Sequence, residues 1–510
     1  MELELKKKSL LCYETVLNAC TNHEETTDVI VPDSSPDILR ILGAFGTVFL
    51  KDEVVTENQY SVTGTVSGWV LYVSEGDFSI RRLEVIIPFS HMFESSEIDS
   101  EQIGFIEMSL AGLEAREINP RKVTVRANVA LCAKTFREIE LEFPCEVRDA
   151  VDNGVESKTR RMSPYTPIAL KKKNVHISED IEISSAQQAF ASMLRYDTQI
   201  KTVDTKIIGT KAVVKGDICL SCVYLTKDGE IAKFNRDIPF SQILEIEQLN
   251  DDCALEVKLH LSDLKLDPQY DMSGDVHYLA LNLSVKLSAI AWAQEEFDVI
   301  DDLYSVRVPL RVRNTTQKIN SKYGRLQKHI SVTEKITCET QADEILDVFV
   351  CMEPIRMRHE EGESALVNGM QVNVVYRAKD GNLYCASRRV ESLCPLPDQT
   401  HEYRAVSTLN EATCSIEAMN EILVKLYVDY EIDECLTVEF EVPCCVEMTT
   451  EEISEKDCPS VIIRKIAQGE TLWKLAKEYR TTIDDIMAAN SLESDEILAG
   501  DMILIPRRRK

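Results

Sequence analysis

Three segments of the chain alternate apolar and polar residues over nine positions each. The segments are residues 123–131, 281–289 and 422–430. Because successive side chains of a β-strand point to opposite faces of a sheet, a period of two is typical of a strand that buries one face. A second alternating segment precedes each of them, at residues 106–110, 255–261 and 414–418. The pattern predicts three pairs of antiparallel strands, each with one buried face.

A sequence motif recurs at an interval of 152 residues. Tyr224 and Tyr376 each lead into an Asp-Gly pair, and Tyr72 holds the corresponding position before a Glu-Gly pair. Glycine adopts positive φ without steric cost, so these pairs predict tight turns between neighbouring strands. The segment Ile87-Pro88-Phe89-Ser90 also recurs at 238–241, although the third copy lacks it. The chain therefore contains three related β-rich units.

Consecutive hairpins with one apolar face bury that face most economically in a sandwich or a flattened barrel. We predict a mainly β protein of tandem antiparallel β-sandwich-like repeats. The expected units are residues 1–155, which include an N-terminal extension, 175–312 and 330–450. Basic, polar residues at 152–176 and 311–329 are interpreted as boundaries between units. Short helices are expected at 36–42 and 186–194, each introducing a unit.

The period of the apolar residues changes near the C-terminus. There they fall at i, i+3, i+4 and i+7, the spacing of one face of a helix. These residues are Leu472, Leu475, Ala476 and Tyr479. A second helix is predicted from Thr482, followed by Asp485 as in a capping box, to Asn490. Apolar segments flank both helices, so residues 461–506 are predicted to form a small β-α-α-β module.

The charge and the apolar content of the chain narrow its possible partners. A net charge of -29 opposes binding to nucleic acid, because that affinity comes mainly from Lys and Arg on phosphates. Residues 461–510 contain nine Lys or Arg against eight Asp or Glu, so they carry +1 and the remainder carries -30. The sequence has no signal-peptide pattern and no apolar run of about 18 residues. We therefore expect a soluble, cytosolic protein without an integral membrane segment.

Patterns typical of catalysis or metal binding are missing from the sequence. The 8 histidines are scattered singly, and there is no phosphate loop or dinucleotide fingerprint. Cys219 and Cys222 form a Cys-x-x-Cys, but positions i and i+3 of a strand face opposite sides, which opposes metal binding. The 16 cysteines are expected to be mostly free, buried thiols. We expect a binding or scaffold protein with no enzymatic activity, cofactor or metal.

The C-terminal module contains a specific set of residues in a fixed order. They are Ile466, Gly469-Glu470-Thr471-Leu472-Trp473, Leu475-Ala476, Tyr479, Ile486, Asn490-Ser491-Leu492, Ile497, Gly500-Asp501 and Ile503-Leu504-Ile505-Pro506. With them the module resembles LysM domains over its whole length. The resemblance implies a groove between the loop after the first strand and the loop after the second helix, which commonly binds N-acetylglucosamine-containing glycans. Short loops at helix ends offer unpaired backbone groups for such a ligand.

The candidate binding residues come from these two loops and their rim, and they serve either a glycan or a protein partner. They are Lys465, Gly469, Glu470, Thr471, Leu472, Lys474, Asn490, Ile497 and Gly500. Three further apolar residues, Trp473, Leu475 and Ile486, are expected in the core of the module.

The upstream units carry motifs of their own. They are Val31-Pro32-Asp33 with Pro36-Asp37-Ile38, the Tyr-x-x-x-Asp-Gly hairpins and the Pro-Phe-Ser copies. In this order before a LysM module, they resemble the tandem sporulation-associated SPOCS domains of SipL-type spore-coat morphogenesis proteins, and the resemblance covers nearly all 510 residues.

The resemblance implies a cytoplasmic mother-cell protein that is recruited to the forespore surface. Such a protein binds the coat-basement ATPase, stage IV sporulation protein A, through its LysM module. The competing hypothesis is a cell-wall protein that binds peptidoglycan or another N-acetylglucosamine glycan. The missing export signal favours the first hypothesis, because peptidoglycan lies outside the cytosol.

Overall fold

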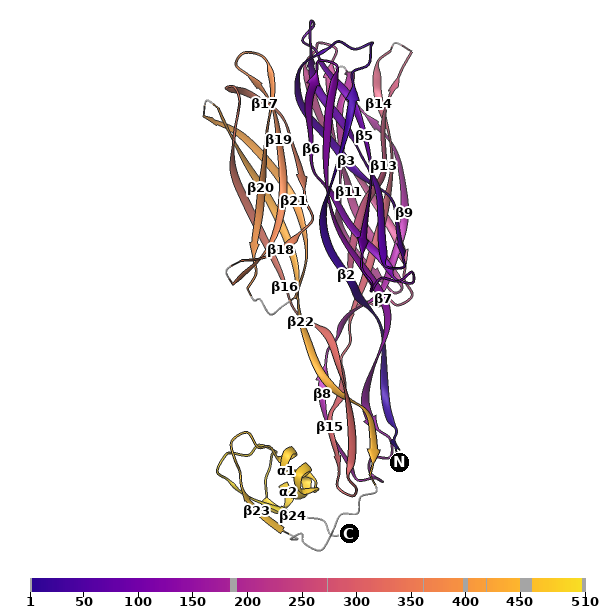
Figure 1. The fold of residues 1–510 in the computed structure, drawn as a ribbon, viewed down its shortest axis with the longest axis vertical. Helices are drawn as coiled ribbons and strands as arrows, with labels where there is room; N and C mark the ends of the chain where they lie inside the picture. The colour runs from indigo at the N-terminus through magenta and orange to yellow at the C-terminus, as the bar shows by residue number, and fades with distance from the viewer. Residues whose placement is uncertain are drawn as a thin grey trace.

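The protein is built almost entirely from long antiparallel strands. The computed structural model describes residues 2–183, 190–272, 274–360, 362–397, 402–418, 420–449 and 461–506. Of the residues that the structure describes, 77% lie in strands and 3% in helices, so the predicted mainly β fold is confirmed. Figure 1 shows a broad head, a narrow stalk below it, and a small module with two helices beside the base of the stalk.

The first unit of the head has six strands in two three-stranded sheets. The strands are β2 (Leu5–Ile30), β3 (Ile38–Thr56), β4 (Gln59–Ser74), β5 (Ile80–Glu94), β6 (Ile103–Asn119) and β7 (Lys122–Val147). One sheet has the order β2-β7-β6 and the other β3-β4-β5. On β7, Val123, Val125 and Ala127 are fully buried while the residues between them are not. The alternating apolar residues of β7 therefore form part of the inner face of a sandwich.

The second unit repeats this arrangement. Its strands are β9 (Tyr165–Glu182), β10 (Phe190–Ile208), β11 (Lys211–Thr226), β12 (Ile231–Glu245), β13 (Ala254–Tyr270) and β14 (Val276–Gln294). The sheets have the orders β13-β14-β9 and β10-β11-β12. The first strand again pairs with the last, and the three middle strands form the opposite sheet.

The third unit keeps the pattern with one added strand. Its strands are β16 (Leu310–Thr337), β17 (Ala342–Met352), β18 (Arg356–Glu360), β19 (Glu363–Ala378), β20 (Leu383–Pro395), β21 (Glu402–Ala418) and β22 (Glu421–Met448). β22 pairs with β16 and β21, while β19 pairs with β17, β18 and β20. Tyr72, Tyr224 and Tyr376, one from each unit, are all almost completely buried. The sequence repeat is thus a repeat of structure.

Residues at the same repeat position meet in the centre of the head. Leu42, Leu194 and Leu346 come from the three units and belong to one apolar cluster. Arg195 follows Leu194 in the sequence and Asp347 follows Leu346, so these two residues are also 152 positions apart. Their side chains form a buried ion pair. The three sandwiches therefore share a central core that contains the buried ion pair of Arg195 and Asp347.

The stalk contains a second apolar core, and all three units contribute strands to it. β2, β7, β16 and β22 extend below the head, and the second unit adds β8 (Val155–Met162) and β15 (Phe297–Ser305). Phe143, Phe297 and Phe440, one from each unit, meet there with ring centroids 5.1 and 6.4 Å from Phe143. β1 (Glu2–Leu3) pairs with β22, which joins the N-terminal end of the chain to the third unit.

The two segments interpreted as boundaries between units form strands and are not polar interruptions of the β structure. Residues 311–329 lie within β16, and most of residues 152–176 lie in β8 and β9. Strands that bury only one face carry many polar residues, which explains why these segments were interpreted as boundaries.

The helix expected at 36–42 is wrong, because β3 begins at Ile38. In the segment 186–194, residues 186–189 lie outside the described residues and the rest belongs to β10. Which units fold as independent domains stays a prediction.

The cysteines follow the sequence expectation with one exception. Cys20 of β2 and Cys132 of β7 lie opposite one another and form a disulfide. Most of the remaining cysteines in the described ranges are free thiols, and several of them, such as Cys12, Cys222 and Cys338, are buried. The pairing depends on strand register, which the cysteine spacing alone does not reveal.

The C-terminal module confirms the predicted β-α-α-β order. Its elements are β23 (Val461–Lys465), α1 (Leu472–Tyr479), α2 (Ile483–Asn490) and β24 (Met502–Pro506), with β23 and β24 antiparallel. Among the described residues, no helix has the length and apolar character needed to span a membrane.

Candidate functional site

The module is organised around a small apolar core. Its helices contribute Leu475, Ala476 and Ile486, and β24 adds Ile503 and Ile505, all of them buried. Helices of eight residues are marginal alone, so this packing supplies most of their stability. The core positions predicted for Leu475 and Ile486 are confirmed.

Threonine side chains fix where the helices start. The Thr471 hydroxyl accepts a hydrogen bond from the Lys474 N–H at 3.3 Å, and the Thr482 hydroxyl accepts one from the Asp485 N–H at 3.0 Å. Both threonines thereby satisfy a backbone donor that a helix N-terminus leaves free. The loop after β23 consequently ends at Thr471.

The two predicted loops lie side by side. The Ile466 N–H donates to the Asp501 carbonyl at 2.9 Å, and the Gly500 N–H donates back to the Ile466 carbonyl at 2.8 Å. Gly469 and Gly500 have φ values of +83° and +104°, which side chains other than glycine rarely adopt. Glycine at these two positions therefore allows both loops to turn sharply at the same end of the module.

Five of the nine candidate binding residues reach the surface. Lys465, Gly469, Thr471, Lys474 and Gly500 are exposed. The Lys474 ammonium donates to the Gly469 carbonyl at 3.1 Å, which ties the first loop to α1. The structure thus brings the first loop and the start of α1 into one surface.

Other candidate residues support the module instead. Leu472 is 1% exposed and Ile497 packs against the core, so Leu472 in particular offers no surface to a ligand. The Glu470 carboxylate accepts from the Ala467 N–H at 2.8 Å and pairs with Arg464 at 2.5 Å. Glu470 therefore closes the first loop.

Asn490 bridges α2 and β24. Its amide nitrogen donates to the Ile486 carbonyl at 2.7 Å and to the Leu504 carbonyl at 2.6 Å. Its amide oxygen accepts from the Leu504 N–H at 2.8 Å. Both amide hydrogens are used within the module, so Asn490 has no donor left for a ligand and holds the second loop in place.

The sequence prediction missed an apolar surface on the outer face of the two-stranded sheet. Val461, Ile463 and Met502 are 48%, 65% and 62% exposed. Register pairs Ile463 with Leu504 and Lys465 with Met502, so these side chains adjoin one another across the sheet. We call this surface, residues 461, 463, 465, 502 and 504, the outer sheet face. Its sequence signal is the unbroken apolar runs at 461–463 and 502–505, where one buried face requires only alternate apolar residues.

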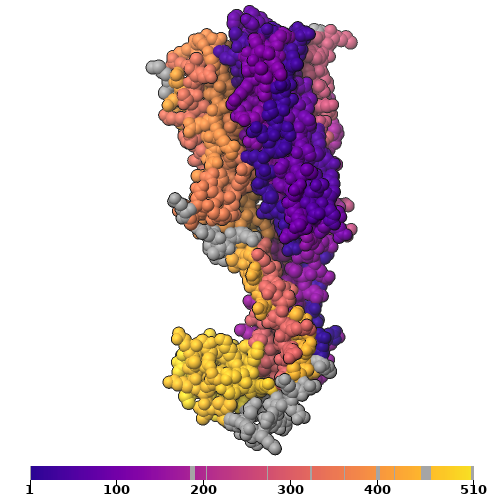
Figure 2. All heavy atoms as spheres, viewed as in Figure 1, coloured from indigo at the N-terminus to yellow at the C-terminus, as the bar shows by residue number. Residues whose placement is uncertain are grey.

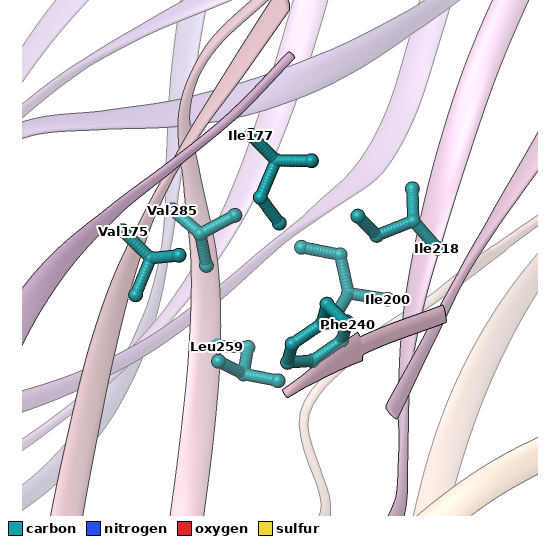
Figure 3. Close-up of a pocket in the computed structure, with 7 residues that line it drawn as sticks. All are labelled: Val175, Ile177, Ile200, Ile218, Phe240, Leu259 and Val285. Atoms are coloured by element: carbon teal, nitrogen blue, oxygen red, sulfur yellow. The ribbon is translucent and has the colours of Figure 1, made fainter. Parts of the chain in front are cut away.

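Two other features of the described residues resemble ligand sites in outline and lack a site's chemistry. The gap in Figure 3 lies between the two sheets of the second unit and is lined only by apolar side chains, including Ile200 and Phe240. It has no polar group to orient a ligand, and it is a packing gap. Asp271, Asp275 and His277 place ligand-type atoms within 4.8 Å of one another, but an ion pair with Lys227 already occupies Asp275.

The fold and the module define a class of protein in which tandem β-sandwiches carry a terminal binding module. Residues 465–506 match the LysM domain, and residues 191–269 match the SipL, SPOCS domain, which here spans β10 to β13. The chain therefore combines a SipL-type SPOCS domain with a C-terminal LysM domain, as predicted, and the two matches together indicate a sporulation-related protein. Both matched domains are binding or scaffold-type modules. Comparisons with curated proteins and with solved structures give no match.

Proposed function

We propose that this protein is a non-enzymatic scaffold of spore-coat assembly whose LysM module binds the coat-basement ATPase, stage IV sporulation protein A. On this proposal it acts in the mother-cell cytoplasm and is recruited to the forespore surface. The proposal is supported by the pairing of a SipL-type SPOCS domain with a LysM domain in one chain.

The observation that carries protein binding is the outer sheet face. Exposed apolar side chains that adjoin one another are typical of protein interaction surfaces. Ile463 and Met502 are each more than half exposed, and Lys465 supplies a positive charge at the rim. A protein with a complementary apolar surface and acidic residues at its edge fits this chemistry.

The second candidate function is binding of an N-acetylglucosamine glycan in the groove between the loops. The LysM match itself favours it. Against it, the Asn490 amide is already hydrogen-bonded within the module. The second loop also carries three exposed carboxylates, Glu493, Asp495 and Glu496, which favour water over a neutral sugar.

Charge reversal at Lys465 or Lys474 is expected to slow association with the ATPase several-fold. The melting temperature should stay close to that of the wild type, because the exposed hydrogen bond from Lys474 to Gly469 contributes little to stability. Both side chains are exposed at the rim of the module, where charges steer association more than they support the fold. Association and dissociation rates measured by surface plasmon resonance at low and high salt would show this effect.

The matched control for these reversals is Lys379→Glu. Lys379 is also exposed but lies in the head, so this variant makes the same change in net charge far from the module. If Lys465→Glu and Lys474→Glu behave like Lys379→Glu, the rim takes no part in the complex. A pull-down with full-length and LysM-deleted protein then shows whether another part of the chain binds the ATPase.

A further inference from the structure

The LysM module touches the rest of the chain through α1. Asp302 on β15 accepts a hydrogen bond from the Trp473 indole N–H at 2.9 Å and forms an ion pair with Lys477 at 2.5 Å. The space-filling view shows the yellow module lying against the base of the stalk (Figure 2). One carboxylate of the stalk thus engages two side chains on the same helix.

Tyr304 adds a second set of contacts two residues further along β15. Its hydroxyl donates to the Thr481 carbonyl at 2.7 Å, just beyond α1. Its ring meets Trp473 edge-on, with centroids 5.0 Å apart. Tyr304 is only 5% exposed and belongs to the apolar cluster of the LysM module, although it is part of the stalk.

The local structure of β15 explains why these two side chains face the module. Residues i and i+2 of a strand lie on one face, so Asp302 and Tyr304 point together while Leu303 between them packs into the stalk core. A register shift in the pairing of β8 and β15 falls between Ile300 and Asp302, and such bulges re-aim the side chains that follow.

The contact between β15 and α1 combines charged hydrogen bonds with buried side chains. Burial opposes ionisation of Asp302, but the hydrogen bonds from Lys477 and Trp473 outweigh it and lower the pKa of the carboxyl group. Trp473, predicted to lie in the core of the module, is half-buried and faces the stalk instead. The sequence of the module alone could not show this, because the partner residues lie more than 150 positions earlier.

We propose that Asp302 and Tyr304 at the end of β15 form a built-in docking site for the α1 surface of the LysM module. The docking site holds the module in one orientation on the stalk. In the docked protein the stalk therefore occupies the α1 surface. Because the outer sheet face is exposed in the docked protein, it stays available to another partner.

The test follows the indole N–H resonances of the tryptophans in the full-length protein by NMR spectroscopy. The chain contains 3 tryptophans, so ¹⁵N-tryptophan labelling gives few signals, and Trp473→Phe assigns the one from the module. In the double variant Asp302→Ala, Tyr304→Ala, which removes both the acceptor and the ring, the Trp473 resonance should shift and its line width should fall several-fold, because an undocked small module tumbles faster than the whole chain. The signals of Trp69 and Trp292 should stay in place.

Two further variants make the result decisive. Lys477→Glu attacks the same contact from the module and leaves the stalk sequence intact, so it should reproduce the narrowing even if the double variant fails to fold. Asp298→Asn, an exposed change on the same strand β15, should give the wild-type spectrum. The docking proposal would be overturned if the Trp473 resonance had the same small line width in the wild type. It would also be overturned if neither Lys477→Glu nor the double variant altered that resonance. These readouts contain no partner protein, so they stand apart from the test of ATPase binding.

Discussion

Replacing Arg195 with alanine is expected to lower the free energy of unfolding by about 3–5 kcal/mol, the range for removing one partner of a buried ion pair. Arg195 is 2% exposed. Its guanidinium donates to Asp347 at 2.8 Å and to Asp197 at 2.5 Å. The substitution therefore leaves two carboxylates in the centre of the head with fewer positive partners.

Arg195 also joins the three units of the head. Asp347 comes from the third unit, and the guanidinium lies over the rings of Phe45 from the first unit and Phe349 from the third, 5.2 and 5.0 Å from their centroids. Burial alone would raise the pKa of Asp347, but the charges of Arg195 and Lys233 lower it. Removal of Arg195 should consequently loosen the contact between units as well as destabilise the second unit.

Urea denaturation followed by circular dichroism measures this loss. The control is Arg161→Ala on β8, which breaks an exposed ion pair with Glu296 (3.0 Å) and should cost less than about 1 kcal/mol. Equal midpoints for Arg195→Ala and Arg161→Ala would show that the central ion pair does not stabilise the head.

Substitution of Ile463 by aspartate is expected to weaken ATPase binding by about 2 kcal/mol or more, roughly thirtyfold, as for a central residue of an interface. Ile463 is 65% exposed in the middle of the outer sheet face, so a carboxylate there disrupts an apolar contact without entering the core of the module. Isothermal titration calorimetry with the full-length protein measures the change in affinity.

A matched exposed isoleucine provides the control for this variant. Ile118 on β6 is 54% exposed and lies in the head, so Ile118→Asp makes the same chemical change away from the module. Thermal melts of both variants should stay close to the wild type. If Ile463→Asp binds the ATPase as tightly as Ile118→Asp, the outer sheet face is not the contact surface.

The repeat and the sheet faces could be predicted because they are written in local periodicity. Alternation on β7 marks the inner face, and the common spacing of Tyr72, Tyr224 and Tyr376 marks three units with the same buried position. The β-α-α-β module was predictable for the same reason, since each element carries its own period and caps.

The stalk and the central ion pair could not be predicted in this way. The stalk strands lie far apart in the chain, and the polar residues of β8 and of the first part of β16 fall in segments interpreted as boundaries between units. The repeat interval relates Arg195 to Asp347, but only the packing of three sandwiches around one centre brings the two side chains together. The disulfide between Cys20 and Cys132 likewise depends on register between distant strands.

The two loops that carry the candidate residues were predicted as loops, whereas their role in binding stays a prediction. Both loops were placed correctly, because their glycines and helix caps are local signals. Leu472 and Asn490 instead serve the module itself, through the core and through hydrogen bonds to β24. The outer sheet face was missed because an apolar run in a short strand does not show which of its residues are left uncovered.

The most direct test of the central claim titrates the full-length protein, by calorimetry, with the coat-basement ATPase and separately with chitin oligomers. The proposed scaffold should bind the ATPase saturably, lose that binding on Ile463→Asp, and show at most weak binding of the sugars. Tight binding of chitin oligomers without binding of the ATPase would contradict the proposal and identify the LysM module as a glycan-binding domain.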